Sequence, residues 1–372
     1  MLSSELDFPL PPELIAQTPH EPRDESRLLH FRRGMPLENA ITHRRVCDLP
    51  EILQPGDMLV FNDTRVLRAR LYGHRQTGGK LEALLLQERQ CNLWQALLKP
   101  SARLRVGERV FFESEDGQNI PAVLEAREDD GWLLRFEPAQ AKNVRELLPQ
   151  FGQVPVPPYI KTVPQEEQYQ TVYAKEWENG LSHSDAETAP PLDSCAAPTA
   201  GLHYTDALLQ ALSAMGVETQ FLTLGVGVGT FRPVQTETLE EHEMHEERFF
   251  VTEETAQAIN RQKQNGRRVI AVGTTTLRVL ESICDDAGQI TAGAGQTDIF
   301  IRPGFGFRCV DALMTNFHLP RSTLLALVAA IMENEASSAL GLSGLASVRY
   351  AYTQAIALNY RFFSFGDAMF IE

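Results

Sequence analysis

The chain has 372 residues, and its 43% hydrophobic content supplies a substantial core, so a wholly disordered chain is excluded. The net charge of −15 argues against a protein that coats RNA or DNA non-specifically, because such proteins usually carry a basic face. The N-terminus lacks a secretory-signal pattern, and the longest strongly apolar run, residues 324–332, is far short of the roughly 20 residues of a membrane span, so we expect a cytoplasmic protein.

The first 65 residues mix short helix and strand signals. Residues 12–16 predict a short helix and residues 26–31 predict a strand. A turn signal at Pro55-Gly56-Asp57 precedes a second predicted strand at residues 58–61. At the end of this strand, residues 61–66 (FNDTRV) form either a ligand site at a domain junction or an Asp63–Arg65 pair that closes the junction.

Between residues 66 and 152 the sequence pattern changes from mixed helix and strand signals to strand signals alone. Six short β-like runs, punctuated by glycines, lie at residues 68–72, 81–87, 92–98, 109–112, 122–127 and 132–136. Their regular spacing predicts a small antiparallel β-barrel inserted into the α/β part of the chain. This segment has 13 Lys and Arg against 12 Asp and Glu, a net of +1, whereas the rest of the chain carries −16. A local basic patch that contacts a specific RNA therefore remains possible.

Helix and strand signals alternate after a long loop at residues 178–197. The predicted helices are residues 206–215, 253–264, 275–284, 323–335 and 345–359, and the predicted strands are residues 217–224, 268–272 and 298–301. This alternation is typical of helices that cover a sheet. The fold class we expect is α/β: a layered α/β/α main domain of residues 1–65 and 153–372, with the barrel of residues 66–152 inserted.

Two glycine-containing segments are candidate ligand sites. Gly273, Thr274, Thr275 and Thr276 lie between a predicted strand and helix, where free N–H groups attract a carboxylate or phosphate, although Thr is also an ordinary helix cap. Residues 224–231 carry Gly225, Gly227 and Gly229 in alternation. They lack the dinucleotide pattern GxGxxG, so they either let a flat group approach the backbone or mark a bulge or a tightly packed strand.

Three histidines are candidates for proton transfer. His203 and His318 each lie in a small-residue loop before a helix, and a neutral imidazole suits base chemistry near pH 7, although a structural role is equally open. His245 lies in residues 242–247 (HEMHEE), where the i, i+3 spacing fails the zinc pattern HExxH. A charged helix start, acid–base chemistry and a metal site remain alternatives there.

The five cysteines are scattered, odd in number and without a CxxC pair, so we expect isolated reduced thiols and no zinc or disulfide framework.

Taken together, these segments resemble the S-adenosylmethionine:tRNA ribosyltransferase-isomerases of queuosine biosynthesis. The matching stretches are residues 61–66 (FNDTRV), 169–174 (YQTVYA), 196–205 (AAPTAGLHYT), 224–233 (LGVGVGTFRP), 242–247 (HEMHEE), 272–280 (VGTTTLRVL), 297–304 (TDIFIRPG), 315–325 (TNFHLPRSTLL) and 360–369 (YRFFSFGDAM). Two departures stand out: Leu67-Arg68 replaces the usual Ile-Pro, and the stretch between Tyr173 and Ala196 is longer than the family's.

The resemblance implies that S-adenosylmethionine is a co-substrate whose ribosyl part passes to 7-aminomethyl-7-deazaguanine at the tRNA wobble position. The product is epoxyqueuosine, adenine and methionine are released, and no metal is needed. In this reaction His203, His245 and His318 are candidates for proton transfer, and Asp298 or Glu247 could steady the sulfonium or the amine. The turn of Gly273, Thr274, Thr275 and Thr276 would hold the methionine carboxylate; Thr199, Gly201, Gly225, Gly227 and Gly229 would hold adenosine.

The tRNA partner must bring its base to a cleft of an acidic protein. We expect basic side chains of the inserted segment to contact its phosphates, together with Asn62 at the junction. These residues are Asn62, Arg65, Arg68, Arg70, Arg75, Lys99, Arg103 and Arg105. Another enzyme acting on nucleotides and a non-catalytic RNA-binding module are the alternatives. We expect a monomer, because no coiled-coil pattern is present.

Overall fold

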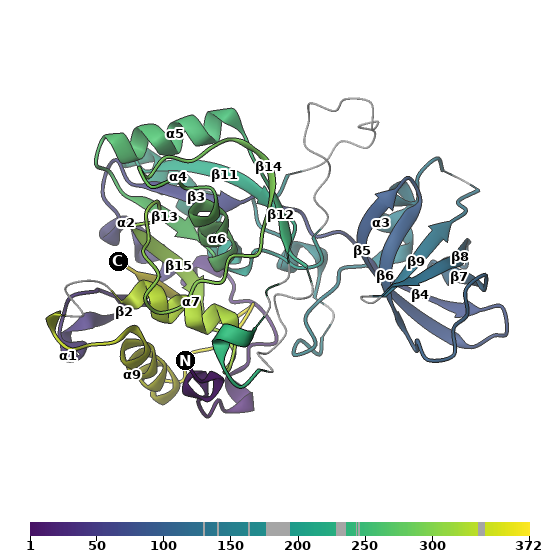
Figure 1. Cartoon of the computed structure of the whole chain (residues 1–372), viewed down its shortest axis with the longest axis horizontal. Helices are drawn as coiled ribbons and strands as arrows, with labels where there is room; N and C mark the ends of the chain where they lie inside the picture. The colour runs from purple at the N-terminus through teal and green to yellow at the C-terminus, as the bar shows by residue number, and fades with distance from the viewer. Residues whose placement is uncertain are drawn as a thin grey trace.

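The computed structural model describes residues 1–128, 131–139, 141–162, 164–175, 194–227, 236–242, 244, 246–333 and 339–372. Within these ranges the chain forms a nine-stranded sheet and a seven-stranded sheet. In Figure 1 the smaller sheet lies to one side of the body that the larger sheet and the helices form.

The nine-stranded sheet has the order β14-β12-β11-β3-β13-β15-β16-β1-β2. Its strands are β1 (Arg27–Phe31), β2 (Ile41–Arg45), β3 (Met58–Asn62), β11 (Glu218–Leu224), β12 (Glu247–Val251), β13 (Val269–Val272), β14 (Gly293–Thr297), β15 (Ala312–Asn316) and β16 (Ala368–Ile371). The neighbours β11, β3, β13 and β15 run parallel. Their carboxyl ends therefore lie at one edge of the sheet, where open α/β folds usually bind ligands.

Both faces of this sheet are covered. Successive side chains of a strand point to opposite faces, so Met58 and Val60 of β3 join one core, whereas Leu59 and Phe61 join another. The first core includes residues of α5 (Glu253–Gln264), α6 (Thr274–Ser282), α7 (Thr323–Met332) and α9 (Gly344–Ala357). The second includes residues of α2 (Leu49–Ile52) and α4 (Asp206–Ala214). The expected layered α/β/α architecture is confirmed.

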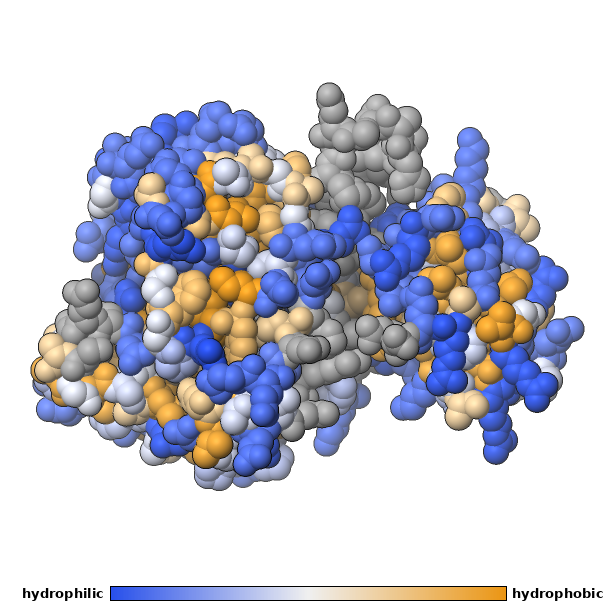
Figure 2. Space-filling model, in the orientation of Figure 1, coloured by the Kyte–Doolittle hydropathy of each residue, from blue (hydrophilic) through white to orange (hydrophobic). Residues whose placement is uncertain are grey.

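Helix α5 shows how the sequence places such a layer. The Thr252 hydroxyl accepts a hydrogen bond from the backbone N–H of Thr255 at 3.1 Å and caps the helix start. Ala256 and Ile259 lie one turn apart and pack into the core. Hydrophilic residues cover the outer side of α5 in Figure 2. The helix is therefore held by one apolar stripe.

The smaller sheet closes on itself. Its strands are β4 (Arg70–Arg75), β5 (Lys80–Gln90), β6 (Leu93–Lys99), β7 (Arg109–Glu113), β8 (Asn119–Glu128), β9 (Gly131–Phe136) and the short β10 (Gly152–Gln153). Pairing of β4 with both β5 and β7 closes a six-stranded antiparallel barrel, and β10 adds to β4. Alternate side chains such as Leu71, Trp94 and Leu134 form a separate core inside it. The predicted barrel is confirmed, and the division of the chain into two domains stays a proposal.

Some local predictions were wrong. The strand expected at residues 298–301 is absent there, and β14 ends just before it, at Thr297. The sequence did not predict β14 because Gly293 and Gly295 are poor strand formers. In the HEMHEE segment Glu247 is the first residue of strand β12, which does not fit the alternative of a helix start at that residue. Most of the loop at residues 178–197 lies outside the described residues. Among the described helices, none is long and apolar enough to cross a membrane.

Candidate active site

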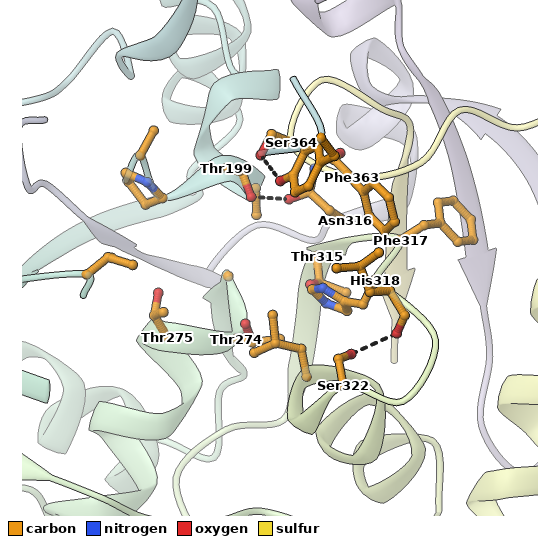
Figure 3. A pocket seen from close by; sticks show the side chains of 18 residues that line it. Thr199, Thr274, Thr275, Thr315, Asn316, Phe317, His318, Ser322, Phe363 and Ser364 are labelled. Atoms are coloured by element: carbon orange, nitrogen blue, oxygen red, sulfur yellow. Dashed lines mark hydrogen bonds between the residues drawn. The ribbon is translucent and has the colours of Figure 1, made fainter. Parts of the chain in front are cut away.

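A cavity opens where β13 and β15 end. Segments far apart in the sequence line it, as Figure 3 shows. Its lining consists of Tyr159, Ala197, Pro198, Thr199, Ala200, Val226, Gly273, Thr274, Thr275, Thr315, Asn316, Phe317, His318, Leu319, Ser322, Leu324, Phe363 and Ser364. The cavity volume is about 60 Å³. Sites for whole drug-sized ligands are roughly 300 Å³ or larger, so this cavity can enclose one end of such a ligand.

The start of α6 forms one wall. Gly273 has φ +97°, a backbone conformation that favours glycine, and it turns the chain from β13 into α6. Because Gly273 is the cap residue and has no side chain, the first N–H groups of α6 lack a side-chain cap. The side chains of Thr274 and Thr275 line the cavity beside them. This wall can therefore bind an anionic group.

Thr276 has a different role from its neighbours. Its hydroxyl donates to the carbonyl oxygen of Val272 at 2.9 Å, and the side chain is fully buried outside the lining. In this structure Thr276 locks the first turn of α6 and does not face a ligand.

His318 follows β15 and also lines the cavity. Its Nε2 is 2.9 Å from the Thr315 hydroxyl oxygen, and its backbone N–H donates to the Tyr352 hydroxyl at 2.9 Å. Burial lowers the pKa of His318 to about 3, because the charged imidazolium would lose its hydration. The imidazole is therefore neutral at physiological pH.

Hydrogen bonds tie the walls together. The Thr199 hydroxyl donates to Asn316 Oδ1 at 2.9 Å, and Asn316 Nδ2 donates to the carbonyl oxygen of Phe363 at 3.2 Å. The hydroxyls of Tyr159 and Ser364 are 2.7 Å apart (Figure 3). The cavity thus depends on four segments that approach one another only in the folded chain.

Several predicted site residues lie outside this lining. His203 is buried, with Nδ1 3.1 Å from the Ala200 carbonyl oxygen and Nε2 3.0 Å from that of Gly366, and burial lowers its pKa. Asp298 is exposed and lines no part of the cavity. His245 lies outside the described residues. Of the three candidate histidines, the structure places His318 in the lining.

Glu247 is buried against Arg278. Its carboxylate accepts a hydrogen bond from Arg278 Nη1 at 2.5 Å, and Arg278 Nε donates to the carbonyl oxygen of Ile299 at 3.1 Å. Both side chains are buried, with 3% of the Arg278 side chain and 4% of the Glu247 side chain exposed. The charge of Glu247 is compensated, so the pair joins α6 to β12.

The predicted adenosine-binding glycines are dispersed. The Tyr173 hydroxyl occupies the space beside Gly201, where an added Cβ would lie 1.9 Å from its oxygen. The N–H of Gly225 donates to the Arg248 carbonyl oxygen at 3.0 Å, and an added Cβ at Gly227 would meet no atom of the described residues within 4 Å. Gly229 lies outside the described residues. Between Gly225 and Gly227, Val226 lines the cavity.

The junction residues expected to bind tRNA are engaged within the protein. Asn62 is fully buried: its Nδ2 donates to the carbonyl oxygen of Leu224 at 3.1 Å, and its Oδ1 accepts from the Leu224 N–H at 3.0 Å. It therefore joins β3 to β11 and has no exposed surface for RNA. Arg65 and Arg68 both bind the carboxylate of Glu166, at 3.2 and 2.8 Å.

The barrel residues are more accessible. Arg70 pairs with Glu82 at 2.7 Å, whereas Lys99, Arg103 and Arg105 are exposed.

Beside Arg103 and Arg105, Arg75 pairs with Glu108 at 2.5 Å, and these four residues help line an open hollow of about 790 Å³. This hollow carries more positive than negative side chains, which suits a phosphate backbone.

Sequence reasoning missed Tyr159, Phe363 and Ser364. Residues 360–369 match the family as a motif, but no ligand-binding role was predicted for them. Tyr159 lies in a Pro-rich linker. Phe363 has φ +71°, which is rare for a bulky residue and brings it and Ser364 to the cavity. No local sequence pattern predicts this positive φ at Phe363. Among the described residues, no group of three or more His, Cys, Asp or Glu could hold a metal ion.

Known proteins match the chain along its whole length. Residues 3–371 match the family described as "Queuosine biosynthesis protein". A protein from Symbiobacterium thermophilum named S-adenosylmethionine:tRNA ribosyltransferase-isomerase is 47% identical over 100% of both chains. A Thermus thermophilus protein of the same name is 47% identical over 98% of both.

A solved structure that is similar to this chain has a name like that of these relatives. The S-adenosylmethionine tRNA ribosyltransferase of Thermotoga maritima is 35% identical, with a TM-score of 0.53, over 99% of this chain and 100% of that one. A family match over nearly the whole chain and relatives of this identity establish the relationship. The chain therefore belongs to the queuosine biosynthesis family and is an S-adenosylmethionine-dependent tRNA ribosyltransferase-isomerase.

Proposed function

We propose that this enzyme transfers the ribosyl part of S-adenosylmethionine to the aminomethyl group of 7-aminomethyl-7-deazaguanine at the tRNA wobble position. It then isomerises the ribosyl group, so that the tRNA carries epoxyqueuosine and adenine and methionine are released. The observation that carries this proposal is the cavity that a neutral His318 lines together with the uncapped start of α6. A proton acceptor and a cradle for an anion then belong to one site.

The small cavity volume suits one end of S-adenosylmethionine. Its methionine carboxylate would accept hydrogen bonds from the first N–H groups of α6 and from the hydroxyls of Thr274 and Thr275. The adenosine end would then extend past Thr199 and Val226 toward the opening. This assignment gives the first N–H groups of α6 the partner that no described side chain supplies as a cap.

The reaction needs a base, since the sulfonium acidifies the neighbouring C5′–H of the ribose. His318 is a candidate because burial keeps its imidazole unprotonated. A carboxylate bound at the nearby start of α6 would raise the pKa of His318 toward the working pH. Loss of the C5′ proton and expulsion of adenine would open the ribose to attack by the amine, and methionine would leave with the electron pair of its C–S bond.

The barrel would deliver the tRNA. Lys99, Arg103 and Arg105 support this assignment because all three are exposed, and Arg103 and Arg105 also line the open hollow. We also expect the protein to act as a monomer in the cytoplasm.

The test is incubation with S-adenosylmethionine and precursor-bearing tRNA. Joint release of adenine and methionine supports the proposal, release of S-adenosylhomocysteine would mean methyl transfer, and binding without turnover would favour an RNA-binding module. His203→Ala, His245→Ala and His318→Ala should be compared with His20→Ala, which alters an exposed histidine. We expect the greatest loss from His318→Ala; full turnover in all three candidate variants would refute the proton-transfer assignment.

A further inference from the structure

The outer face of the barrel strand β4 carries an exposed tyrosine. Tyr72 is 44% exposed and is one of the large side chains that the described part of the chain leaves in solvent. Successive side chains of a strand point to opposite faces, and the neighbouring Leu71 belongs to the barrel core. Tyr72 therefore shares the outer face with Arg70 and His74, each two positions away, which is roughly 7 Å along a strand. These three side chains form a row along the outside of β4.

One end of the row is a pair of stacked rings. His74 lies opposite Phe111 of β7, and the two rings stack with 5.4 Å between their centroids and 28° between their planes. His74 Nδ1 lies 3.0 Å from the Arg75 carbonyl oxygen, and its Nε2 lies 3.1 Å from a carboxylate oxygen of Glu113. Contacts to both ring nitrogens fix the orientation of the imidazole. Tyr72 thus has a flat, ordered surface as its neighbour along the strand.

The other end of the row leads toward the cavity. Arg70 Nη2 donates to the carbonyl oxygen of Val156 at 3.3 Å, in the segment through which the chain leaves the barrel. Three positions later in that segment, Tyr159 lines the cavity. Arg70 also pairs at 2.7 Å with Glu82 of β5, which lies opposite Tyr72. The row therefore begins beside a segment that reaches the cavity.

Positive charge lies where β4 ends. Arg75, the last residue of the strand, lines the open hollow of the barrel together with Arg103 and Arg105. The lining also includes the carboxylate of Glu108, so the three guanidinium groups outnumber it. The two carboxylates named above beside the row are each paired within the protein. A nucleic-acid strand can therefore place phosphates in the hollow while one of its bases lies on the row.

An exposed aromatic ring beside a basic hollow suits an unpaired strand better than a duplex. Every base has a flat face that can stack on an aromatic side chain, and that face is accessible only where the base is splayed out of a helix. The relatives of this chain act on tRNA, and the loops of tRNA carry unpaired bases. The chemistry of this face therefore matches a loop of the tRNA.

We propose that the ring of Tyr72 stacks on an unpaired base of the tRNA anticodon loop, while the phosphates of the same strand lie in the hollow of Arg75, Arg103 and Arg105. This contact rests on the proposed function, which brings the wobble base of that loop to the cavity. Because the row begins beside the segment that reaches the cavity, a base near the reacting one is the occupant. Tyr72 is thus a positioning residue that holds the loop and touches no reacting atom.

The experiment measures binding of an anticodon stem-loop RNA to the full chain without S-adenosylmethionine. Tyr72→Ala should weaken binding about 5- to 150-fold, the loss expected when a base loses its aromatic partner. Tyr72→Phe keeps the ring and should bind like the wild-type protein, as should Tyr350→Ala, which removes a tyrosine of α9 far along the chain from the barrel. Because Tyr72 is uncharged, the slope of affinity against salt should not change in Tyr72→Ala.

A second measurement reports the stacking itself. 2-Aminopurine, whose fluorescence falls on stacking, replaces the loop bases one at a time, and at one position or more the complex with Tyr72→Ala should be brighter than those with the wild-type protein and Tyr72→Phe. A duplex of the stem alone should bind all of these proteins equally.

The proposal is overturned if no loop position responds to Tyr72→Ala, if Tyr72→Phe loses as much affinity as Tyr72→Ala, or if the stem duplex loses affinity as well. Neither measurement needs turnover. Stacking without release of adenine and methionine on addition of S-adenosylmethionine would therefore count against the proposed reaction and not against this contact.

Discussion

The contact between Gly201 and Tyr173 allows a quantitative test of how the Thr199–His203 segment is held. A Cβ added at Gly201 would lie 1.9 Å from the Tyr173 hydroxyl oxygen and 3.0 Å from Tyr173 Cζ and Thr171 Cγ2. The ring of Tyr173 cannot swing aside, because Phe61 and Phe221 lie 4.7 and 5.5 Å from it between ring centroids. Overpacking of this kind typically costs about 1–3 kcal/mol, so we expect Gly201→Ala to destabilise the segment by that amount.

Tyr173→Phe is the matched partner. The Tyr173 hydroxyl is buried without a hydrogen-bond partner among the described residues, so its removal should leave stability unchanged or slightly raised. In the double variant the 1.9 Å contact disappears and the closest approach becomes 3.0 Å. We therefore expect the double variant to recover most of the stability that Gly201→Ala loses.

Hydrogen exchange read by mass spectrometry reports the effect locally, with the barrel strands β5 and β6 as an internal reference. In Gly201→Ala the segment of Thr199–His203 should exchange faster, and the Michaelis constant for S-adenosylmethionine should rise as the Thr199–Asn316 hydrogen bond is lost. Unchanged exchange in Gly201→Ala, or a double variant no better than the single one, would refute the reasoning.

Three further predictions concern charge. The pKa of His318 is lower in the folded state than the usual value of 6.5, so the free energy of unfolding should fall as the pH drops below 6.5. The fall should be at most about 1.4 kcal/mol per pH unit. Urea unfolding at pH 7, 6 and 5 should show a smaller fall for His318→Gln than for the wild-type protein. Glu247→Gln or Arg278→Met alone should lower the free energy of unfolding by about 3–5 kcal/mol in the same assay, because either change leaves one buried group without its partner. The double variant should lose less, and a double variant as destabilised as the single ones would contradict this. Arg103→Glu with Arg105→Glu should weaken tRNA binding most at low salt and flatten its salt dependence, whereas an unchanged affinity would exclude the barrel hollow as a phosphate contact.

The sequence predicts the framework well where periodicity is strong. The six barrel strands follow from alternation, and α5 has the expected bounds because its cap and apolar stripe agree. Of the predicted site positions, five line one cavity: Thr199, Gly273, Thr274, Thr275 and His318. Residue type and loop position were enough to place them near a ligand.

What the sequence could not supply is the direction of each side chain. Gly201 looks like a position for ligand approach, yet its open side faces Tyr173. Thr276 belongs to the same threonine run as Thr275 but bonds back to Val272, and Asn62 turns inward. The Glu281 carboxylate binds the backbone N–H groups of residues 308–310, a contact that no local pattern encodes.

The position of β16 has a consequence for synthesis on the ribosome. This last strand lies between β15 and β1, and β1 and β2 join the large sheet only through it. The barrel strands, by contrast, come from one contiguous stretch that ends at Gln153. At translation rates of about 5–20 residues per second, the barrel can close on the order of ten seconds or more before residues 368–371 emerge. The large sheet must wait for residues 368–371, so for that interval the nascent chain carries a finished barrel and an open catalytic sheet.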